Sequence, residues 1–386
     1  MNKVIIFGGN HTNALGMARV FGINNIPVYG IITTSSLKKR DNYCIYSKYW
    51  CKYYLVSSEE EGLNILLNEF WNEAEKPVVM PTSDGAALIV DDNIELLSKK
   101  FYLPSINGES GKIRSLMNKF NQFIFAKQLG LKYADSWIVD QIDTGCYDIS
   151  QIEYPCIVKP VLSPEGSKVD ICRIEKETDL NAYLKELQEK KYKRVLIQKY
   201  LNKDYEMELF GSIPKHTDKI PFFLTKHFRE YPSICGTVSC HQYIYDANLI
   251  SQAHTILYKV KEYGYTGNID IELFKIGDDI WLNEVNFRNS GDIYACFADK
   301  LYYPVILYLD TLGMSTEHLN FNMIKSKYAI DEFQDLGLVL KKEQSVFTWL
   351  KYIFKSSNHA YLFKNDYMPL FCVLFKKITC KLKRII

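Results

Sequence analysis

Several sequence patterns that would point directly to a reaction are absent from this chain of 386 residues. It contains no CxxC pair and no cysteine–histidine run with zinc spacing, although it has ten cysteines. It also contains no GxxxxGKS/T phosphate loop, no GxGxxG dinucleotide pattern and no GxSxG nucleophile turn. The sequence therefore gives no support to zinc-binding, P-loop, NAD-dependent or serine-hydrolase chemistry. The scattered cysteines indicate free thiols in a reducing compartment.

Long apolar runs are missing as well. Nothing approaches the roughly 18 apolar residues of a transmembrane helix. The first apolar run, residues 3–7, is too short for a signal peptide. We therefore expect a cytoplasmic protein.

A large net charge is also missing, because 47 Lys and Arg residues stand against 45 Asp and Glu residues and leave a formal charge of +2. This balance excludes a globally basic nucleic-acid-binding protein, so we expect no nucleic-acid partner. It conceals an asymmetry. Residues 340–386 hold ten basic and two acidic residues, a net of +8, so the other 339 residues carry −6.

Short apolar runs alternate with helical patterns over the first 110 residues. This alternation is typical of βαβ units, so we predict a Rossmann-like α/β domain with a parallel sheet at residues 1–110. Its strands are expected at 3–7, 26–32, 52–56 and 77–80, and its helices at 12–22, at 58–74 and in a segment that ends near 97.

The middle of the chain changes in character and predicts an α+β arrangement with antiparallel strands. A long helix is expected over 112–129, ended by Gly130, and an amphipathic helix over 249–264. A hairpin with strands 267–275 and 280–286 is the clearest feature. Other strands are expected at 155–160, 168–174, 194–200, 207–211 and 222–228, with a charged helix at 177–191 and helices over most of 292–313.

The hairpin carries the most informative side chains. Alternation puts Asp270 and Glu272 on one face of its first strand, and Glu284 and Asn286 on one face of its second. With a turn centred on the glycine–aspartate segment, Glu272 faces Glu284, and such like charges repel each other. A bridging Mg²⁺ or Mn²⁺ removes this conflict, since both ions prefer oxygen ligands. A solvated hairpin face with accidental charge pairing is the alternative interpretation.

Two other segments place polar residues at strand ends. Lys159 ends the run Ile-Val-Lys-Pro and precedes the small-residue loop 163–168, where N–H groups can cradle a phosphate. The strand 195–201 leads to a polar break with Glu206 beyond it, where backbone groups can bind a flat heterocycle and a carboxylate can accept from ribose. An exposed strand-end lysine and an ordinary edge strand are the alternatives.

In this chain order the segments resemble the ATP-grasp superfamily: a parallel α/β domain, the Ile-Val-Lys-Pro strand, the Ile-Gln-Lys-Tyr-Leu hinge and a closing Glu…Glu-x-Asn-x-Arg hairpin. The resemblance covers about residues 1–315. It implies that a two-lobed ATP-grasp fold follows the Rossmann-like domain. The division it implies is a pre-ATP-grasp domain at 1–110, a small nucleotide-binding lobe at 111–200, a large lobe at 201–320 and a basic C-terminal extension at 321–386.

The resemblance also implies roles for individual residues. The chain departs from the usual pattern of the superfamily at Lys199, where an acidic residue is common, and in the loop 163–168, which has a single glycine. As implied by the resemblance, Lys119, Lys159 and Ser167 bind ATP phosphates, Gln198 and the backbone of Lys199 and Leu201 hold adenine, Glu206 binds ribose, Glu272, Glu284 and Asn286 hold Mg²⁺ or Mn²⁺, and Arg288 stabilises the transferred phosphoryl group.

Within the superfamily the chain is most similar to carboxylate–amine ligases of the D-aspartate and amino-acid ligase-like group. That similarity implies an ADP-forming ligase that makes an amide bond through an acyl phosphate, with an amino acid or a cell-envelope glycan precursor among its small-molecule substrates. Lys226 and Arg229 are candidates for gripping a substrate carboxylate, against the alternative of a solvated strand face. A catalytically silent ATP-binding scaffold at the membrane and a carboxylase of the biotin-carboxylase kind are the competing functions.

The C-terminal extension combines apolar residues with a basic flank. The run from Met368 to Phe375 precedes Lys376 and Lys377 and further basic residues. This combination suits an interfacial anchor on anionic lipid at the inner face of the cell membrane. A packed final segment with a solvated basic end is the alternative, and a homodimer is a further expectation that the sequence leaves open.

Overall fold

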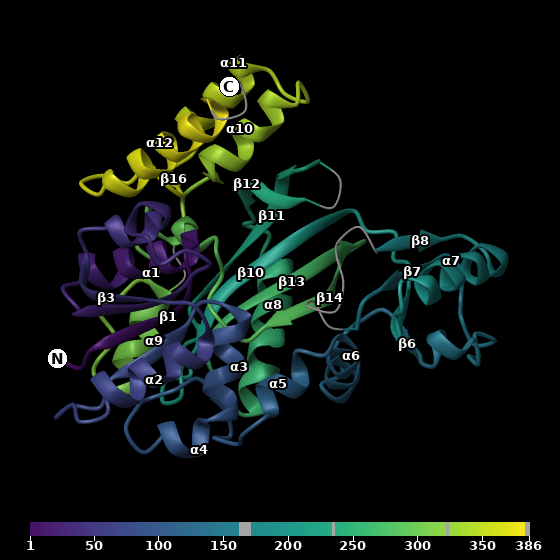
Figure 1. The fold of residues 1–386 in the computed structure, drawn as a ribbon, viewed down its shortest axis with the longest axis horizontal. Coiled ribbons are helices and arrows are strands. Elements are labelled where there is room, and N and C mark those ends of the chain that lie inside the picture. The colour runs from purple at the N-terminus through teal and green to yellow at the C-terminus, as the bar shows by residue number, and fades with distance from the viewer. Residues whose placement is uncertain (162–170, 234–235, 322–323, 383–386) are drawn as a thin grey trace. The chain divides into compact units, whose positions relative to one another are not determined.

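The computed structural model describes residues 1–161, 171–233, 236–321 and 324–382 (Figure 1). The chain divides into two compact units. The larger unit comprises Met1–Ile113, Glu208–Asp270 and Asn286–Ile386, and the smaller unit comprises Arg114–Met207 and Ile271–Val285. The predicted division into four consecutive parts stays a prediction.

The larger unit begins with a parallel sheet. Its strand order is β3-β2-β1-β4, and each neighbouring pair runs parallel, as predicted for a Rossmann-like domain. The helices between the strands begin at polar caps: the Ser58 side chain accepts from the Glu61 N–H and the Ser83 side chain from the Ala86 N–H. The elements are β1 Val4–Gly9, α1 Thr12–Ile23, β2 Val28–Thr33, β3 Trp50–Val56, α2 Glu59–Glu69, β4 Val78–Pro81, α3 Asp84–Asp92 and α4 Ile94–Leu97.

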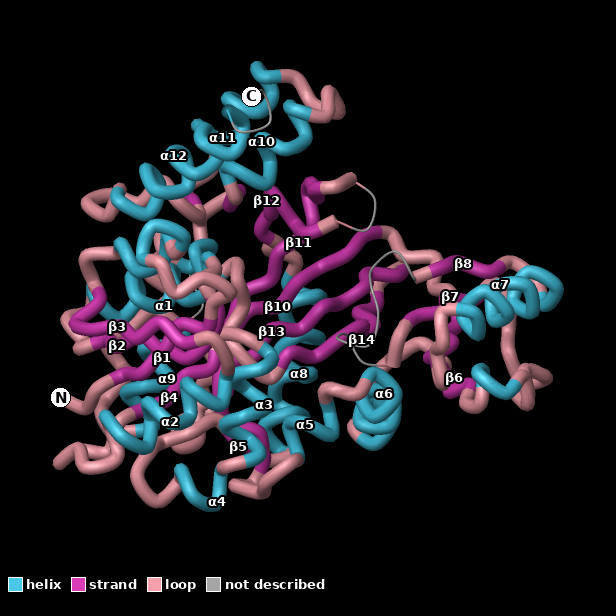
Figure 2. The backbone as a smooth tube through the Cα atoms, viewed as in Figure 1, coloured by secondary structure: helices cyan, strands magenta, loops and turns pink. Residues whose placement is uncertain are grey.

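An eight-stranded sheet follows, with the order β14-β13-β10-β11-β12-β15-β16 and with β5 paired to β13. Figure 2 shows its long strands in magenta with α8 beside them. The expected hairpin is present as β13 and β14. The elements are β5 Ser105–Ile106, β10 Tyr205–Ile213, β11 Phe222–Tyr231, β12 Thr237–Tyr243, α8 Ala247–Glu262, β13 Tyr265–Ile276, β14 Asp279–Asn286, α9 Tyr303–Thr311, β15 Tyr328–Ile330 and β16 Asn358–His359.

A four-stranded antiparallel sheet of the smaller unit has the order β6-β9-β7-β8. One face of this sheet and α7 share a core that includes Val158, Ile197 and Leu184. The elements are β6 Ser136–Val139, β7 Cys156–Lys159, β8 Cys172–Ile174, α7 Glu177–Glu189 and β9 Val195–Lys199. The mixed α/β and α+β fold class predicted from the sequence is therefore confirmed.

The single helix predicted over 112–129 is wrong. The structure has α5 at Lys112–Leu116 and α6 at Lys119–Gln128 instead. The break occurs because Asn118 adopts an extended backbone and its side-chain oxygen accepts from the Phe120 and Asn121 N–H groups, which starts a new helix. As a result, Lys119 lies in the first turn of α6.

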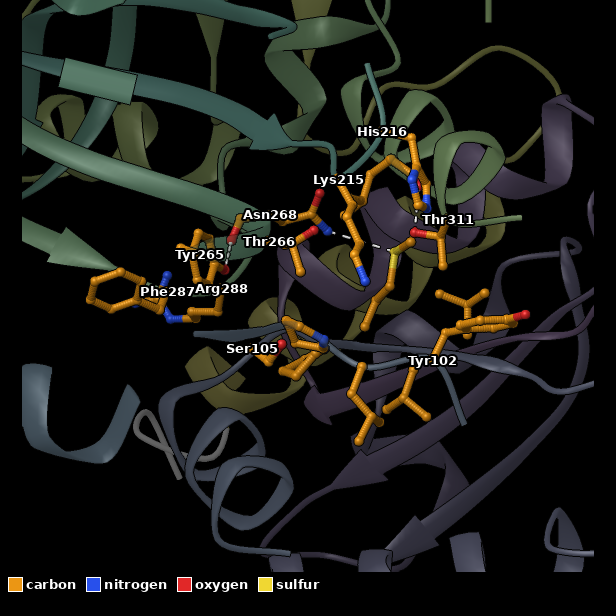
Figure 3. Close-up of a pocket in the computed structure, with 18 residues that line it drawn as sticks. Tyr102, Ser105, Lys215, His216, Tyr265, Thr266, Asn268, Phe287, Arg288 and Thr311 are labelled. Atoms are coloured by element: carbon orange, nitrogen blue, oxygen red, sulfur yellow. Dashed lines mark hydrogen bonds between the residues drawn. The ribbon is translucent and has the colours of Figure 1, made fainter. Parts of the chain in front are cut away.

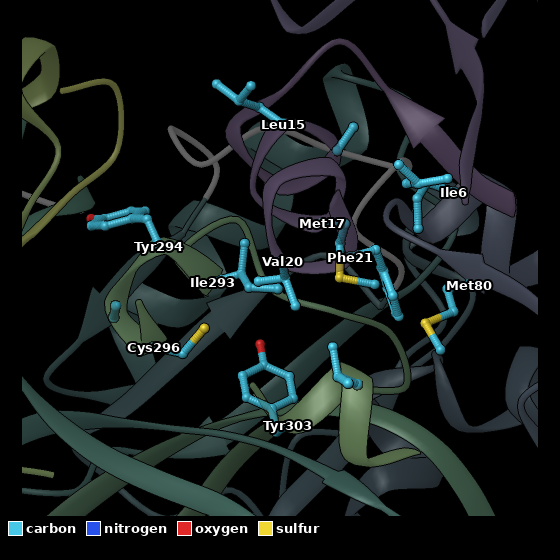
Figure 4. Close-up of a cluster of buried hydrophobic side chains, with 14 of the residues drawn as sticks. Ile6, Leu15, Met17, Val20, Phe21, Met80, Ile293, Tyr294, Cys296 and Tyr303 are labelled. Atoms are coloured by element: carbon cyan, nitrogen blue, oxygen red, sulfur yellow. The ribbon is translucent and has the colours of Figure 1, made fainter. Parts of the chain in front are cut away.

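Helix α1 joins the two sheets of the larger unit into one apolar core. Leu15, Val20 and Phe21 are fully buried there, together with Ile293 and Tyr303 from the segment after β14 (Figure 4). Close packing requires a glycine in α1, because a Cβ atom at Gly16 would lie 2.2 Å from the Ile293 side chain. The segment after β14 is thus packed directly against the N-terminal domain's first helix.

Three helices near the end of the larger unit were not predicted as such from the sequence: α10 Glu332–Leu340, α11 Val346–Lys355 and α12 Met368–Leu382. They gather at one end of the view in Figure 1. Helix α12 packs against the short helical turn Tyr43–Tyr46. Among the described residues, none of the helices has the length and apolarity that a membrane crossing requires.

Candidate active site

Two of the predicted phosphate and adenine ligands meet in the smaller unit. Lys159 ends β7, and its Nζ donates to Gln198 Oε1 on the adjacent strand β9 at 2.8 Å. The other end of the Gln198 amide donates to Ser136 Oγ at 3.0 Å, which fixes the side chain. An antiparallel β7–β9 register that pairs Ile157 with Gln198 produces this contact.

Lys119 meets one of the predicted metal ligands. Its Nζ lies 2.6 Å from Glu284 Oε2, and both side chains are largely buried, with exposed fractions of 16% and 22%. Lys119 owes its position to the helix break at Asn118, whereas Glu284 comes from β14. The pair joins residues that are 165 positions apart in the sequence.

The electrostatics of Lys159 show that these groups share one environment. Burial and the nearby Lys119 ammonium lower the pKa of Lys159 to about 8, while the Glu284 and Glu272 carboxylates oppose this shift. Two lysines and two carboxylates are therefore close enough to influence one another. A site of this kind can hold a polyanion and its counter-cation.

Three polar residues that the sequence analysis missed support this cluster. Gln122 of α6 grips the β14 backbone at Val285 twice: its Nε2 donates to the carbonyl at 2.9 Å and its Oε1 accepts from the N–H at 2.8 Å. Asn283 Nδ2 donates to Glu272 Oε2 at 3.0 Å. Tyr133 is buried nearby, and burial raises its pKa. Each is an ordinary residue type in a helix, strand or loop, so no pattern marks it.

In the larger unit, Arg288 is surrounded by oxygen atoms. Its Nε donates to Asp84 Oδ1 at 2.6 Å, one terminal nitrogen lies 3.5 Å from Asp270 Oδ2, and the other donates to Asn286 Oδ1 at 3.3 Å. Asp84 follows Ser83, the cap of α3, so the first turn of α3 supplies this partner. The two carboxylates hold the guanidinium in place, and a guanidinium with a fixed orientation is suited to binding an anion.

A second cluster in the larger unit surrounds the buried imidazole of His241 on β12. Its Nε2 lies 3.4 Å from Asp292 Oδ2, and its Nδ1 lies 3.6 Å from Glu208 Oε2 and 3.0 Å from Thr225 Oγ1. Burial alone would raise the pKa of Asp292, but the charge and hydrogen bond of His241 lower it overall. Ligand atoms of Glu208, His241 and Asp292 all lie within 4.8 Å of one another, a spacing that a divalent cation would also fit.

The remaining predicted residues have varied surroundings. Glu206 forms an ion pair with Lys203, and the exposed Lys199 Nζ lies 2.6 Å from Glu153. Leu201 and Lys226 are half-buried. Ser167 lies outside the described residues.

Arg229 has a structural partner of its own. Its guanidinium binds the fully buried Asp335 of α10 through two hydrogen bonds of 2.7 and 2.9 Å, and it stacks over the ring of Tyr352 at 4.3 Å. Nε and one terminal nitrogen are thus engaged by Asp335, and the role of Arg229 as a substrate ligand stays a prediction.

A cavity of about 190 Å³ in the larger unit lies beside Arg288. Figure 3 shows it between the β4–β5 segment and β13, with Tyr102, Lys215 and Asn268 among the side chains around it. Its volume falls below the roughly 300–1,000 Å³ of pockets that enclose organic ligands. We therefore do not assign a nucleotide or a substrate to it.

Comparison with known proteins agrees with this geometry. A family model described as an ATP-grasp domain matches residues 124–295. The chain is 27% identical to the formate-dependent phosphoribosylglycinamide formyltransferase of Burkholderia vietnamiensis over 172 residues, which is 42% of each protein. The chain thus spans less than half the length of the curated relatives that it matches.

Solved structures match over more of the chain. The N5-carboxyaminoimidazole synthetase of Staphylococcus aureus complexed with ADP matches with a TM-score of 0.66 and 18% identity over 88% of this chain and 84% of that one. The biotin carboxylase domain of the Hydrogenobacter thermophilus 2-oxoglutarate carboxylase, in complex with MgADP and bicarbonate, matches with a TM-score of 0.60 and 12% identity over 85% and 73%.

The family match covers the segment that carries Lys159, Glu272 and Glu284, and begins just after Lys119, while the fold matches along most of the chain. The class that the matched segment defines is the ATP-grasp domain. Residues 124–295 are thus identified as an ATP-grasp domain, and the resemblance to the ATP-grasp superfamily read from the sequence motifs is confirmed.

Proposed function

We propose that this protein is an ATP-dependent carboxylate–amine ligase that forms an amide bond through an acyl phosphate and releases ADP and phosphate. The observation that carries the proposal is the meeting of Lys119 and Lys159 with Glu272 and Glu284 in the smaller unit. Two ammonium groups suit a phosphate chain, and two carboxylates suit its divalent counter-ion. An ADP-forming ligase agrees with the ADP bound to the similar synthetase and the similar carboxylase domain.

In the proposed nucleotide site, Lys119 and Lys159 bind the ATP phosphates in place of their present partners. Gln198 and the backbone of Lys199 and Leu201 hold the adenine, and Glu206 accepts from the ribose hydroxyls. The Lys199 N–H donates to the Asp135 carbonyl at 2.9 Å, so the adenine contact proposed for this residue falls to its carbonyl. Ser167 belongs to the proposed phosphate-binding loop.

Glu272, Glu284 and Asn286 form the proposed Mg²⁺ or Mn²⁺ site. Carboxylate and amide oxygens fit either of these ions, and Asn283 and Lys119 now occupy two of the carboxylate oxygens. When bound, the ion neutralises charge on the ATP phosphates. Because Lys119 and the ion compete for Glu284, we expect loading with MgATP to separate the Lys119–Glu284 pair.

The first step of the proposed reaction is phosphoryl transfer. A substrate carboxylate oxygen bonds to the γ-phosphorus, the bond from that phosphorus to the β–γ bridging oxygen breaks, and ADP leaves with the electron pair. Arg288, oriented by Asp84 and Asp270, stabilises charge on the transferred group. The protein needs no nucleophile of its own, which fits the missing hydrolase motifs.

The second step joins the amine to the activated carbonyl. The amine nitrogen bonds to the carbonyl carbon, the carbon–oxygen bond to the phosphoryl group breaks, and phosphate leaves. The attacking ammonium must also lose its protons, and the Asp292 carboxylate beside His241 is the proposed acceptor for one of them. The carboxylates of Glu208 and Asp292 also suit recognition of a cationic amine.

The proposed substrates include an amino acid or a cell-envelope glycan precursor, and Lys226 is the proposed ligand of a substrate carboxylate. A carboxylase is kept as a second candidate because the similar biotin carboxylase domain was solved with bicarbonate. A catalytically silent nucleotide-binding scaffold would also retain the fold. We further propose that the protein acts in the cytoplasm and that it forms a homodimer, since the similar biotin carboxylase domain is described as a dimer.

The test is ADP release by the purified protein with Mg²⁺ over a panel of amino acids, carboxylated acceptors and bicarbonate. The ligase requires both a carboxylate and an amine, and ¹⁸O supplied in the carboxylate must appear in the released phosphate. Release that depends on bicarbonate alone would favour the carboxylase, and no release with intact nucleotide binding would favour the scaffold. Full activity of Glu284→Gln and Lys159→Ala variants would refute the proposed site.

A further inference from the structure

Helix α11 is apolar on two opposite faces. Its inner face packs on the larger unit: Trp349 Nε1 donates to the Glu332 carbonyl at 3.3 Å, and the Tyr352 ring lies 5.0 Å from that of Phe228. Its outer face carries Phe347, Leu350 and Phe354, which follow the i, i+3, i+7 spacing of one helical stripe. We call these three residues the α11 stripe.

The α11 stripe is strongly exposed. Phe347 and Phe354 each show 85% of their surface to solvent, and Leu350 shows 38%. Single exposed apolar residues are ordinary, but a contiguous row of large ones marks a surface that binds something. A helix that is apolar on both faces is normally covered on both, so the stripe is expected to have an occupant.

Helix α12 presents a similar row. Met368, Phe371 and Phe375 are exposed by 54%, 57% and 70%, at a spacing of three and four residues. The opposite side of α12 includes Val373, which is buried in the core of the larger unit. Both helices belong to the group at one end of the view in Figure 1.

The surroundings of these rows are basic. Lys351 and Lys355 lie on α11 itself and are exposed, as are Lys376 and Lys377 on α12. Residues 340–386 hold ten basic and two acidic residues. One of the two acidic residues, Asp366, is buried in an ion pair with Arg19 at 2.8 Å, so it does not offset the surface charge.

We propose that the α11 stripe and its lysines dock this protein on an anionic lipid bilayer, with the α12 row as a second contact. Exposed phenylalanines that flank lysines are the composition of an interfacial helix, in which rings enter the acyl boundary and ammonium groups meet phosphates. A second copy of the chain fits less well, because two such faces would bring two basic surfaces together. The proposal does not depend on the ligase activity.

Co-sedimentation with lipid vesicles tests this docking surface. The full chain should bind vesicles that mix phosphatidylcholine with phosphatidylglycerol, bind pure phosphatidylcholine at least about tenfold more weakly, and dissociate as salt is raised. The double variant Phe347→Ser/Phe354→Ser removes the rings, and Lys351→Glu/Lys355→Glu reverses the charge. Each should weaken binding to the mixed vesicles about tenfold or more.

A matched control variant is available on α8. Ile250 and Tyr258 are exposed by 37% and 47%. The two lysines of α8 near them, Lys259 and Lys261, are half-buried, and Lys261 is paired with Asp218, unlike the exposed lysines of α11. Ile250→Ser/Tyr258→Ser should bind the mixed vesicles as the unmodified protein does. Thermal unfolding and ADP release of all variants are measured in parallel, and both should be unchanged, which separates this proposal from the proposed reaction.

Two results would overturn the proposal. One is that the unmodified protein binds vesicles with and without phosphatidylglycerol equally well or binds neither. The other is that the Phe347→Ser/Phe354→Ser variant binds the mixed vesicles as strongly as the unmodified protein. Light scattering on the same samples shows whether the stripe instead joins two copies. In that case the unmodified protein is a dimer, the serine variant is a monomer, and the lipid proposal is wrong.

Discussion

Lys159 is a cation whose charge depends on the pH of ordinary assays. Its pKa is lowered to about 8 by burial and by Lys119, so its ammonium form is favoured below that pH and is lost above it. In the unfolded chain the lysine keeps its usual higher pKa, so the buried charge opposes folding below about pH 8, and this cost shrinks as the pH rises toward the unfolded value. The site therefore holds a charge that is unfavourable until an anion arrives.

We predict that ATP affinity falls as pH rises from 7 to 9, by up to about tenfold per pH unit above the pKa. The reason is that the phosphate-bound form needs a charged Lys159. Isothermal titration calorimetry should also detect proton uptake on binding near pH 8. In Lys159→Arg the guanidinium stays charged, so its affinity should be nearly independent of pH over this range; an equally steep profile in that variant would contradict the assignment.

Two ion pairs of equal length allow a buried pair of the proposed active site to be compared with an exposed pair. Lys119–Glu284 and Lys199–Glu153 are both 2.6 Å long, but the first is largely buried and the second is exposed. We predict that Glu284→Gln lowers the rate of ADP release about 10²-fold or more and raises the Mg²⁺ concentration needed, because a carboxylate ligand is lost. Glu153→Gln should keep the rate, and equal effects in both would refute the metal role of Glu284.

At the scale of elements, the hairpin is positioned by a helix that the sequence did not delimit correctly. Gln122 lies on α6 and makes both backbone hydrogen bonds of Val285 on β14. Glu284 precedes Val285 directly, so the two bonds fix the strand next to a proposed metal ligand.

We predict that Gln122→Ala destabilises the fold by about 2–4 kcal/mol, because it leaves a buried N–H and a buried carbonyl without partners. It should also lower the rate of ADP release more than it weakens ATP binding, since it moves Glu284 rather than removing it. Urea denaturation and steady-state kinetics measure both effects. Gln128→Ala, at the exposed end of the same helix, should change neither; a similar loss in Gln128→Ala would show a general effect on α6.

The elements that the sequence predicted are those with strong local patterns. The parallel strands and the hairpin have clear apolar periodicity and turns, and the motif order was enough to identify the superfamily. The break before Lys119 depends on one asparagine cap, which competes with an otherwise continuous helical pattern. Gln122 reaches Val285 in the smaller unit, and Asp84 reaches Arg288 and Asp292 reaches His241 in the larger unit, through packing between distant segments. No local spacing in the sequence records such contacts.

At the scale of the whole molecule, the C-terminal helices are bound to the first helix of the chain. Arg19 of α1 is fully buried, and it pairs with Asp366 while donating to the Ala360 carbonyl at 2.8 Å. Ser47 Oγ and the Lys48 N–H donate to the same carboxylate at 2.9 and 3.0 Å. The sequence suggested a separate basic extension because the net charge becomes positive toward the end of the chain. The net charge does not reveal the buried ion pair between Arg19 and Asp366.

We predict that Asp366→Ala destabilises the larger unit by about 3–5 kcal/mol, because Arg19 would remain buried without a counter-charge. The exposed pair Lys52–Glu69 provides the comparison, and Glu69→Ala should cost less than about 1 kcal/mol. Chemical denaturation of the two variants measures the difference. If Arg19→Met in the Asp366→Ala background does not recover stability, the loss does not come from the uncompensated charge.

The Arg19–Asp366 pair also has a consequence for biosynthesis. The pair joins residues 347 positions apart, so the ribosome has made α1 long before it makes the carboxylate that neutralises it. Until then the nascent larger unit holds an arginine that is costly to bury, and its core around α1 is incomplete. Translation must pass residue 366 before this unit can close, and chains cut short before that residue should be left to chaperones and proteases.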